Sequence, residues 1–533
     1  MKTLKQIFPP LLLLMILYVQ IVSLYVNYSI YDSRELAILF AWIPLFTLPY
    51  ILTRKKVIYK IAVTLFFVAG FINLSHLLIL KGPVTASSLF ILLNTNIREA
   101  SEFMELKSSG LMLLTIPYLL LFVIAARNVK PVKIHPKNSY IIIIVLLFSS
   151  IFLAENLIHG RLIRKGIPQT AKALVSFADE IKTYKALKKR KVTKHEVDFK
   201  TSELEQQTFV LIIGESCNRN HMSLYNYAKK TNPKLEQRND IIVFNNVVSP
   251  YSNTLGSVLS ALTESNLENK MGFDKSVSLI DIFHSINFKT FWLSNQSPIG
   301  IWDNAIYNLA QTSDVSIFVN NAGNTSFEST YLSSYDERLF GTLHTALKDD
   351  SQNKFIVIHL MGSHSAYSKR YPPDYDVFTS HTNNKEQLIN AYDNSILYND
   401  FIVDSMFNIL SYYSSQTYET ISSCIYFSDH GENVYDENDN AGHDYSGSMP
   451  KSNVEIPFIV WLSTEYKNKF SEKNSAILSN TDLPFVSDDL FHAVLDLNDI
   501  TSKIYSKNRS LFNPDFNAER RRILEDNMDY DLK

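Results

Sequence analysis

Cysteine is nearly absent from this chain: Cys217 and Cys424 are the two cysteines among 533 residues. A framework of several disulfides is therefore excluded, and at most one bridge is possible. Cys424 falls inside a predicted strand at Ser422–Phe427, whereas Cys217 follows the end of another at Phe209–Gly214. If both strands carry functional groups at the same sheet edge, the two sulfurs are on the order of 20 Å apart, too far to bond. We expect two free thiols.

An excess of one charge sign is absent as well. The chain has 51 Lys and Arg against 53 Asp and Glu, a formal net charge of -2, which gives no indication of a nucleic-acid partner. The charged residues are unevenly distributed along the chain, because long runs almost free of charge are concentrated in its first part. A chain of this length is expected to form more than one domain.

The first part of the chain contains five apolar runs. They are Ile7–Val26, Leu36–Leu52, Ile61–Leu80, Gly110–Ala126 and Tyr140–Ala154. Most approach the roughly 20 residues that a helix needs to cross a bilayer. Buried core helices are the alternative, but five consecutive runs with almost no charge favour the membrane. Residues 1–158 are therefore predicted to form a five-helix transmembrane bundle.

Basic residues between the runs predict how this bundle is oriented. They form three clusters: Lys2 and Lys5; Arg54, Lys55, Lys56 and Lys60; and Arg127, Lys130, Lys133 and Lys137. With five spans all three clusters fall on one side, which the positive-inside rule makes the cytoplasm. The N-terminus is expected inside the cell and everything after the fifth span outside. The first run is long and no small-residue cleavage site follows it, so we do not expect a cleaved signal peptide.

Residues 159–205 are predicted to bridge the membrane part to the rest of the chain. They are basic and helical in pattern, for example at Tyr184–Lys191. A solvated linker is one explanation. An amphipathic helix on the outer membrane surface, attracted to anionic headgroups, is the one we favour.

From residue 206 to 533 the pattern changes to α/β. Predicted strands are Phe209–Gly214, Ile241–Val248, Thr290–Leu293, Phe355–Leu360, Ser422–Phe427 and Ile456–Leu462, and predicted helices include Ser278–Ile286 and Lys385–Leu410. This alternation is typical of a mostly parallel sheet covered on both faces, with ligands at the carboxyl ends of its strands. The charged tail Asp515–Lys533 is expected to be a surface helix.

Chemically active side chains follow several of these strands. They are Glu215, Thr254 at the expected start of a helix, His364 after the strand that contains His359, the pair Asp429 and His430, and His443 in a glycine-bearing loop. Carboxylates and imidazoles without thiolates suit a catalytic Zn²⁺ with an open position. A threonine hydroxyl is a weak nucleophile until a divalent metal lowers its pKa, and a helix N-terminus stabilises the resulting anion.

Each of these residues also has an ordinary explanation. Glu215 alone could be a loop acid, Thr254 a helix cap, and His364 and His443 polar loop residues. Ser252 or Asn253 could be the nucleophile or the cap instead of Thr254. His359 is expected to be a satisfied structural histidine, and Arg219 and His221 to brace the loop after Glu215. Their joint occurrence at strand exits favours a shared site.

Four motifs resemble those of the phosphoethanolamine transferases of the Gram-negative envelope, which are inner-membrane members of the alkaline phosphatase and sulfatase superfamily. The motifs are G-E-S-C-N-R-N-H-M-S-L-Y-N-Y at Gly214–Tyr227, H-L-M-G-S-H-S-A-Y-S-K-R-Y-P at His359–Pro372, S-D-H-G-E at Ser428–Glu432, and the later G-H-D. The resemblance implies a five-helix transmembrane bundle joined to a periplasmic sulfatase-like α/β domain.

The resemblance also implies a set of site residues. Zn²⁺ would be held by Glu215, Thr254, Asp429 and His430, with one ion bound tightly and room for a second. Thr254 would be the metal-bound nucleophile, while His364 and His443 would bind the phosphoryl group, act as acid or base, or hold the second zinc. The segment T-N-I-R-E-A at Thr95–Ala100 resembles an outer-face helix that helps form the lipid site, which assigns Thr95 and Glu99 to substrate binding.

The implied function is transfer of phosphoethanolamine from phosphatidylethanolamine to lipopolysaccharide, on a core sugar or on lipid A, through a covalent phospho-threonine intermediate. Pro250 and Leu259 stand where the lipid A-modifying members have cysteines, which favours the core-modifying branch. A related phosphoglycerol transferase, a phosphatase or sulfatase-type hydrolase, and a non-catalytic envelope scaffold are the alternatives. The sulfatase nucleophile motif, Cys or Ser followed by x-Pro-x-Arg, is missing from the sequence.

Overall fold

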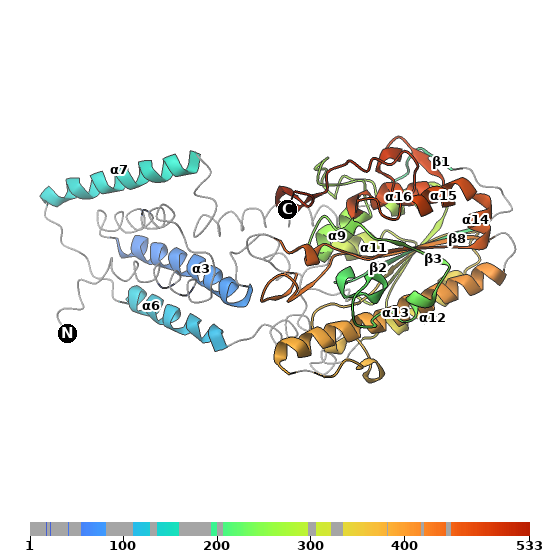
Figure 1. Ribbon diagram of the computed structural model, residues 1–533. Coiled ribbons are helices and arrows are strands. Elements are labelled where there is room, and N and C mark those ends of the chain that lie inside the picture. The colour runs from blue at the N-terminus through green and yellow to red at the C-terminus, as the bar shows by residue number, and fades with distance from the viewer. Residues whose placement is uncertain are drawn as a thin grey trace. The chain divides into compact units, whose positions relative to one another are not determined.

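The computed structural model describes residues 18, 22, 41, 55–80, 110–127, 136–158, 193–199, 206–296, 305–320, 334–380, 382–416, 420–443 and 449–532. The chain divides into two compact units, one with long apolar helices and the other with a large sheet. Each unit is described below by itself, with the element labels of Figure 1.

The first unit contains the helices α3 (Lys56–Leu80), α6 (Thr115–Arg127, preceded by the 3₁₀ turn η2, Gly110–Leu114) and α7 (Pro136–Ile158). They cover the third, fourth and fifth predicted spans. Among the described residues, Val57–His76 is long and apolar enough to cross a membrane, and Met112–Arg127 and Ile143–Asn156 are shorter apolar helices. The first two predicted spans lie almost wholly outside the described residues.

Tyrosine hydroxyls join α3 to α6. The Tyr59 hydroxyl donates to the Ala125 carbonyl at 2.8 Å, and the Tyr118 hydroxyl donates to the Phe66 carbonyl at 3.2 Å. Gly70 makes the second contact possible, because a Cβ there would lie 1.8 Å from the Tyr118 hydroxyl oxygen. Large apolar side chains remain exposed on all three helices, which suits a lipid surrounding better than water.

The second unit is built on a seven-stranded sheet with the order β3-β11-β8-β2-β7-β5-β6. The strands are β2 (Gln206–Gly214), β3 (Ile241–Phe244), β5 (Lys289–Ser294), β6 (Val315–Phe318), β7 (Asn353–His359), β8 (Thr420–Ser428) and β11 (Phe458–Leu462). The pairs from β8 to β6 are parallel, and β11 runs antiparallel to both β8 and β3. The sheet is thus mostly parallel, as predicted.

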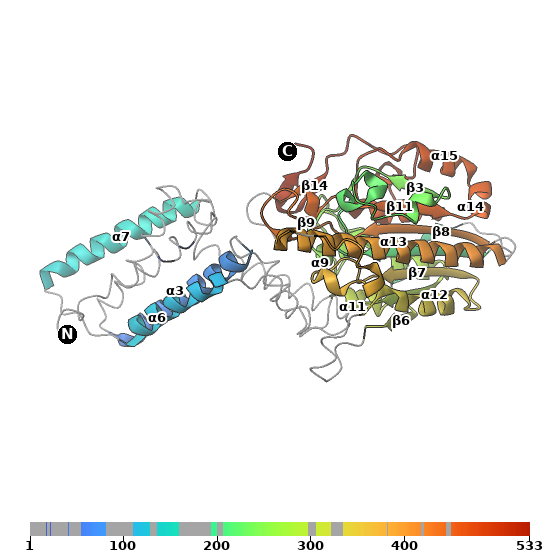
Figure 2. The ribbon, with the colours of Figure 1, turned by 60° about the horizontal axis from the view of Figure 1, so that its bottom comes forward.

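Helices cover both faces of the sheet. Figure 1 shows α12 (Leu339–Leu347) and α13 (Asn384–Gln416) on one face and α14 (Thr464–Lys469), α15 (Ser471–Ser479) and α16 (Leu490–Leu497) on the other, and Figure 2 shows α13 running along β8 and β7. Further helices are α9 (Thr254–Ala261), α10 (Leu279–Ser285) and α11 (Ala305–Ala310). Short strands are β1 (Val197–Phe199), β4 (Val247–Val248), β9 (Asn433–Val434), β10 (Ala441–Gly442), β12 (Phe485–Val486), β13 (Ile500–Ser502), β14 (Ile523–Leu524) and β15 (Met528–Asp529).

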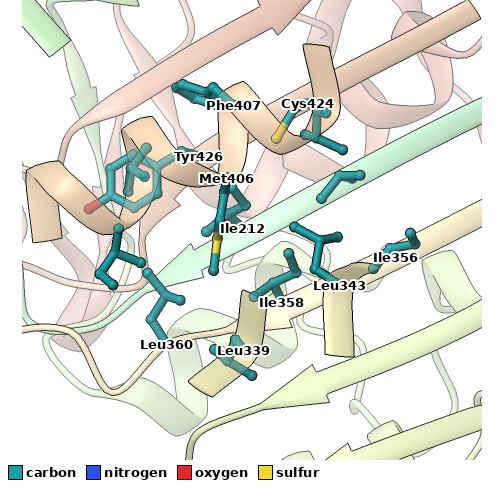
Figure 3. Close-up of a cluster of buried hydrophobic side chains, with 14 of the residues drawn as sticks. Ile212, Leu339, Leu343, Ile356, Ile358, Leu360, Met406, Phe407, Cys424 and Tyr426 are labelled. Carbon is teal, nitrogen blue, oxygen red and sulfur yellow. The ribbon is translucent and has the colours of Figure 1, made fainter. Parts of the chain in front are cut away.

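Alternating side chains of β2 supply two cores. Val210 and Ile212 face α12 and α13, in the cluster shown in Figure 3. Phe209 points to the opposite face, where its ring stacks on Phe283 of α10 and on Phe355 of β7. This two-sided burial explains why the strand is apolar without interruption from Phe209 to Ile213.

Both cysteines are free and buried, which confirms the prediction of two free thiols. Cys424 lies in the core between β8 and α13 (Figure 3). The Cys217 sulfur lies 3.7 Å from the Met222 sulfur, and burial raises the pKa of the Cys217 thiol to about 12. Both side chains therefore serve as small apolar packing groups.

Three predicted elements are wrong in detail. Within the predicted helical linker, Val197–Phe199 forms strand β1, which pairs antiparallel with β13, while 159–192 and 200–205 lie outside the described residues. The predicted strand 241–248 divides into β3 and β4, and β4 pairs with β12 outside the main sheet. The tail 515–533 contains the hairpin β14–β15 instead of the predicted helix, because Arg522 and Glu525 bind residues of the domain.

Candidate metal and nucleophile site

The register of the central strands brings three ligand-type side chains together. Gly214 at the end of β2 pairs with Ser428 at the end of β8, so Glu215 and Asp429 leave neighbouring strands at the same level. The Asp429 amide donates to the Gly214 carbonyl at 3.1 Å, which holds the two exits side by side. His430 follows directly, and all three side chains are buried.

Glu215, Asp429 and His430 form one candidate metal group, with one ligand atom of each lying within 4.8 Å of the others. His430 Nε2 is 3.4 Å from Glu215 Oε1 and 3.5 Å from Asp429 Oδ2. His430 Nδ1 is 2.7 Å from the Gly431 carbonyl oxygen, which can only accept. Nδ1 therefore carries a proton, and Nε2 is the ring atom directed at the carboxylates.

The charges of this group favour a cation. Burial raises the pKa of Asp429, and the charge of Glu215 raises it further, to about 7. Burial opposes ionisation of Glu215 and of His430, but their mutual contact holds the pKa of Glu215 well below its usual range, and Asp429 and Glu215 together raise the pKa of His430 to about 10. Two buried carboxylates thus share a single imidazolium.

Asp429 supplies a direct test of whether a metal fits. Its Oδ1 accepts from the amides of Ser216 and His430. Its Oδ2 is buried and makes no hydrogen bond in the described part of the chain, although His430 Nε2 lies 3.5 Å away as an ion-pair contact. An orphaned carboxylate oxygen is costly unless something positive binds it. Oxygen and imidazole donors without a thiolate suit Zn²⁺ at a catalytic site. The residues present fit the metal.

Thr254 is the hydroxyl that faces this group. Its Oγ1 lies 3.3 Å from each carboxylate oxygen of Glu215 and 3.4 Å from His430 Nε2. The other two candidates are occupied elsewhere. Asn253 caps helix α9 by accepting from the Gly256 amide at 3.0 Å, and the Ser252 hydroxyl donates to Glu525 at 2.7 Å.

A second candidate metal group adjoins the first through His430. It consists of His430, Glu432 and His443, again with ligand atoms within 4.8 Å of one another. His443 Nδ1 lies 2.9 Å from Glu432 Oε2, and the Tyr367 hydroxyl donates to Glu432 Oε1 at 2.6 Å. Burial opposes ionisation of Glu432, but His443, Tyr367 and His430 hold its pKa below the usual range.

His364 and His359 differ in their surroundings. His364 is half-buried after β7, its Nδ1 lies 3.3 Å from the Ser365 hydroxyl, and its charge helps to lower the pKa of Glu215. His359 is buried at the end of β7, with its ring edge-on to Trp292. The expectation that His359 is a satisfied histidine is wrong, because its Nε2 has no hydrogen-bond partner among the described residues.

The loop after Glu215 is held from several sides. His221 bridges two carboxylates, with Nδ1 2.7 Å from Asp393 and Nε2 2.9 Å from Asp436, and the Arg219 guanidinium donates to the Val247 carbonyl. The prediction that Arg219 and His221 brace this loop is confirmed. Ser216 adopts a left-handed φ of 55°, an uncommon conformation for a residue with a side chain, directly beside Glu215.

Sequence reasoning missed two polar residues of the site. Glu432 lies inside the motif S-D-H-G-E, but no role was assigned to it. Gln296 donates to Glu215 Oε2 at 3.4 Å and to the Leu360 carbonyl at 2.7 Å. Its position just after β5 was a usable signal, because Glu215 and Asp429 occupy the same kind of position. Thr95 and Glu99 lie outside the described residues.

Comparison with known proteins identifies the family of the chain. Residues 207–500 match the sulfatase family, and the chain belongs to this family. Its relatives include phosphoethanolamine transferases, which confirms the resemblance seen in the motifs. EptC of Escherichia coli O18:K1:H7 is 28% identical over 512 residues, 90% of this chain and 86% of the relative. EptA of Helicobacter pylori is 30% identical over 298 residues, 54% of this chain and 52% of the relative.

Solved structures show the same fold. The C-terminal periplasmic domain of EptC from Escherichia coli, also solved in complex with Zn, matches with a TM-score of 0.56 and 27% identity, covering 64% of this chain and 97% of that domain. EptA from Neisseria meningitidis, an integral membrane protein, matches with a TM-score of 0.72 at 18% identity, covering 94% of this chain and 98% of that one. The second match extends the shared fold over nearly the whole chain.

Proposed function

We propose that this chain transfers phosphoethanolamine from phosphatidylethanolamine to a lipopolysaccharide acceptor, a core sugar or lipid A, through a covalent intermediate on Thr254. One observation carries the proposal: a threonine hydroxyl at a helix N-terminus lies 3.3 Å from both oxygens of Glu215 and 3.4 Å from His430. The extensive similarity to EptC supports the choice of phosphoethanolamine as the transferred group.

Glu215, Asp429, His430 and Thr254 would hold one Zn²⁺. His443 with Glu432 would either take part in holding a second or leave His443 free for the proton transfer described below, and in the first case His364 is the acid. When bound, zinc lowers the pKa of a hydroxyl and offsets negative charge on phosphoryl oxygens. The start of α9 would stabilise the same charge, because Thr254 is the first residue of the helix and a helix N-terminus favours an anion.

In the first half-reaction, deprotonated Thr254 Oγ1 forms a bond to phosphorus. The bond between phosphorus and the glycerol oxygen breaks, and diacylglycerol leaves with a proton from His364 or His443. In the second half-reaction, an acceptor hydroxyl gives its proton to the same imidazole and displaces Oγ1 from phosphorus. Thr254 and the imidazole return to their starting states, so every proton is accounted for.

The membrane part belongs to the same proposal. Five spans over residues 1–158, an N-terminus in the cytoplasm and a linker at 159–205 would anchor the domain 206–533 at the periplasmic face of the inner membrane. Both donor and acceptor are lipids, so a site held near the bilayer receives them directly. Thr95 and Glu99 would contribute to binding the donor lipid.

Mass spectrometry of the Thr254 peptide tests the proposal. Purified full-length protein is incubated with phosphatidylethanolamine without acceptor, and in parallel with phosphatidylglycerol. We expect a phosphoethanolamine adduct on Thr254 and release of diacylglycerol, both abolished in Thr254→Ala and unchanged in Thr345→Ala, an exposed threonine of α12. A phosphoglycerol adduct alone would instead identify a phosphoglycerol transferase. Diacylglycerol release without any adduct would contradict the covalent intermediate.

A further inference from the structure

The C-terminal hairpin reaches the loop that carries Thr254. The Glu525 amide donates to the Pro250 carbonyl at 2.8 Å. Glu525 Oε1 accepts from both the amide and the hydroxyl of Ser252, at 2.9 and 2.7 Å. Three hydrogen bonds therefore connect one glutamate to the three-residue stretch 250–252, which ends just before the helix cap Asn253. Glu525 lies beyond residues 207–500, the part that matches the sulfatase family.

The hairpin itself is firmly attached to the domain. Arg522 is buried, donates to Asn246 Oδ1 at 2.7 Å, and pairs with Asp531 across the hairpin. Tyr530 donates its hydroxyl to Glu455. These contacts on either side of Glu525 fix the turn, so that the carboxylate is presented to Ser252 in a defined position.

Ser252 depends on Glu525. The residue is 5% exposed, and among the described residues its amide and hydroxyl have Glu525 as their acceptor. Removing the carboxylate would leave two buried donors unpaired, which favours a shift of the loop toward water or another acceptor. Thr254 follows two residues later, so a shift of Ser252 moves Thr254 Oγ1 relative to Glu215 and His430.

The helix after Thr254 has supports that do not involve Glu525. The Ser257 amide donates to the Asn253 carbonyl at 3.1 Å, and the Ser257 hydroxyl donates to the Tyr251 carbonyl at 3.1 Å. The ring of Tyr251 also packs on Gly256, where an added Cβ would lie 2.6 Å from it. Loss of Glu525 should therefore misplace the start of α9 without unfolding the helix.

We propose that Glu525 is a positioning residue: it fixes Ser252 so that Thr254 Oγ1 is held against Glu215 and His430. This inference rests on the proposed function of Thr254 as the nucleophile. It extends the working site to a segment outside the matched family region. Ser252 then acts by holding the loop in place through Glu525, and not as a nucleophile.

The test compares Glu525→Ala and Glu525→Gln with the matched control Glu519→Ala, which removes an exposed glutamate from the same tail. Full-length protein is assayed for kcat and KM with phosphatidylethanolamine, for bound zinc, and for hydrogen exchange of the peptide 250–256. We expect Glu525→Ala to lower kcat by about 10- to 100-fold with little change in KM, because small displacements of a reacting group have effects of this size. Exchange in 250–256 should rise while zinc content is unchanged.

Glu525→Gln keeps an oxygen that can accept from Ser252, so it should recover most of the lost kcat and restore protection of 250–256. The inference is overturned if Glu525→Ala leaves both kcat and exchange at wild-type values, or if it lowers only the fraction of folded, zinc-loaded protein. A failure of the proposed function has a different signature: wild-type protein would then give no lipid turnover, while the effect of Glu525 on exchange would persist.

Discussion

The rings of His430 and His443 meet edge to face, with 4.6 Å between their centroids and 60° between their planes. His430 belongs to both candidate metal groups, so this contact joins the group at Thr254 to the group at Glu432. A phosphoryl group bound to Thr254 would therefore lie near the ring of His443, whose Nδ1 contacts the buried carboxylate of Glu432. In the proposed mechanism, this arrangement would place an acid–base group next to Thr254.

Zinc binding should depend on Asp429 and on pH. Asp429→Asn replaces the orphaned oxygen and removes one charge, and we expect zinc affinity to fall by at least 100-fold, with Asp350→Asn as an exposed control.

The pKa of His430 is raised to about 10 and that of Asp429 to about 7. Zinc must displace these protons, so affinity should rise by about tenfold per displaced proton for each pH unit. Zinc competition assays between pH 6 and 8 measure the slope, and a flat profile would contradict the assignment.

Glu432 should control the orientation of His443. Glu432→Gln keeps the size of the side chain, but the amide can offer either oxygen or NH₂ to His443 Nδ1, so the proton on the ring is no longer fixed. We expect kcat for lipid turnover to fall by about 10- to 100-fold. Glu472→Gln, at an exposed position of α15, is the matched control. Unchanged kcat in a zinc-loaded Glu432→Gln protein would remove Glu432 from the working site.

Side chains that follow neighbouring parallel strands are predictable from the sequence. Glu215 and Asp429 were identified from the ends of apolar runs, and they meet because β2 and β8 are parallel and in register at Gly214 and Ser428. The same argument applied to β5 would have found Gln296. Glu525 carried no such signal: its contact with Ser252 spans 273 positions of the chain and depends on how the tail folds back.

The local sequence pattern does not predict structure where tertiary contacts determine it. Charged residues at 515–533 resemble a solvated helix, but Arg522 is buried against Asn246, and Asp526 and Asn527 adopt left-handed φ values of 59° and 56° that end any helix. His359 reads as an ordinary strand residue, because its unpartnered nitrogen becomes visible only after its neighbours in the sheet are known.

His221 should make stability fall at alkaline pH. Burial lowers the pKa of a histidine, but Asp393 and Asp436 raise that of His221 to about 9. The unfolded value is about 6.5, so the contribution is complete below that pH and disappears as pH rises through 9, with a magnitude of about 3 kcal/mol. Thermal unfolding from pH 6 to 9.5 should show His221→Gln approaching wild type at the alkaline end. The control is His344→Gln, because the ring of His344 makes no ion pair in the described part of the chain. This variant should show no such convergence with wild type.

Gly362 should tolerate no side chain. Its φ of 51° is left-handed, and a Cβ would lie 2.8 Å from the backbone nitrogen and oxygen of Glu215. Asp336 fixes this turn by accepting from the amides of Met361 and Gly362, so the turn cannot move away freely. We expect Gly362→Ala to displace Glu215 and lower zinc affinity by at least 10-fold.

Gly341 is the matched control for that substitution. It lies in α12 with no heavy atom within 4 Å of an added Cβ. Gly341→Ala should keep zinc affinity and raise stability by about 0.5–1 kcal/mol, because alanine loses less backbone entropy than glycine in a helix. Isothermal titration with zinc and thermal unfolding of both variants distinguish the outcomes. If Gly362→Ala binds zinc as tightly as Gly341→Ala does, the backbone contact between Gly362 and Glu215 is not what places the metal ligand.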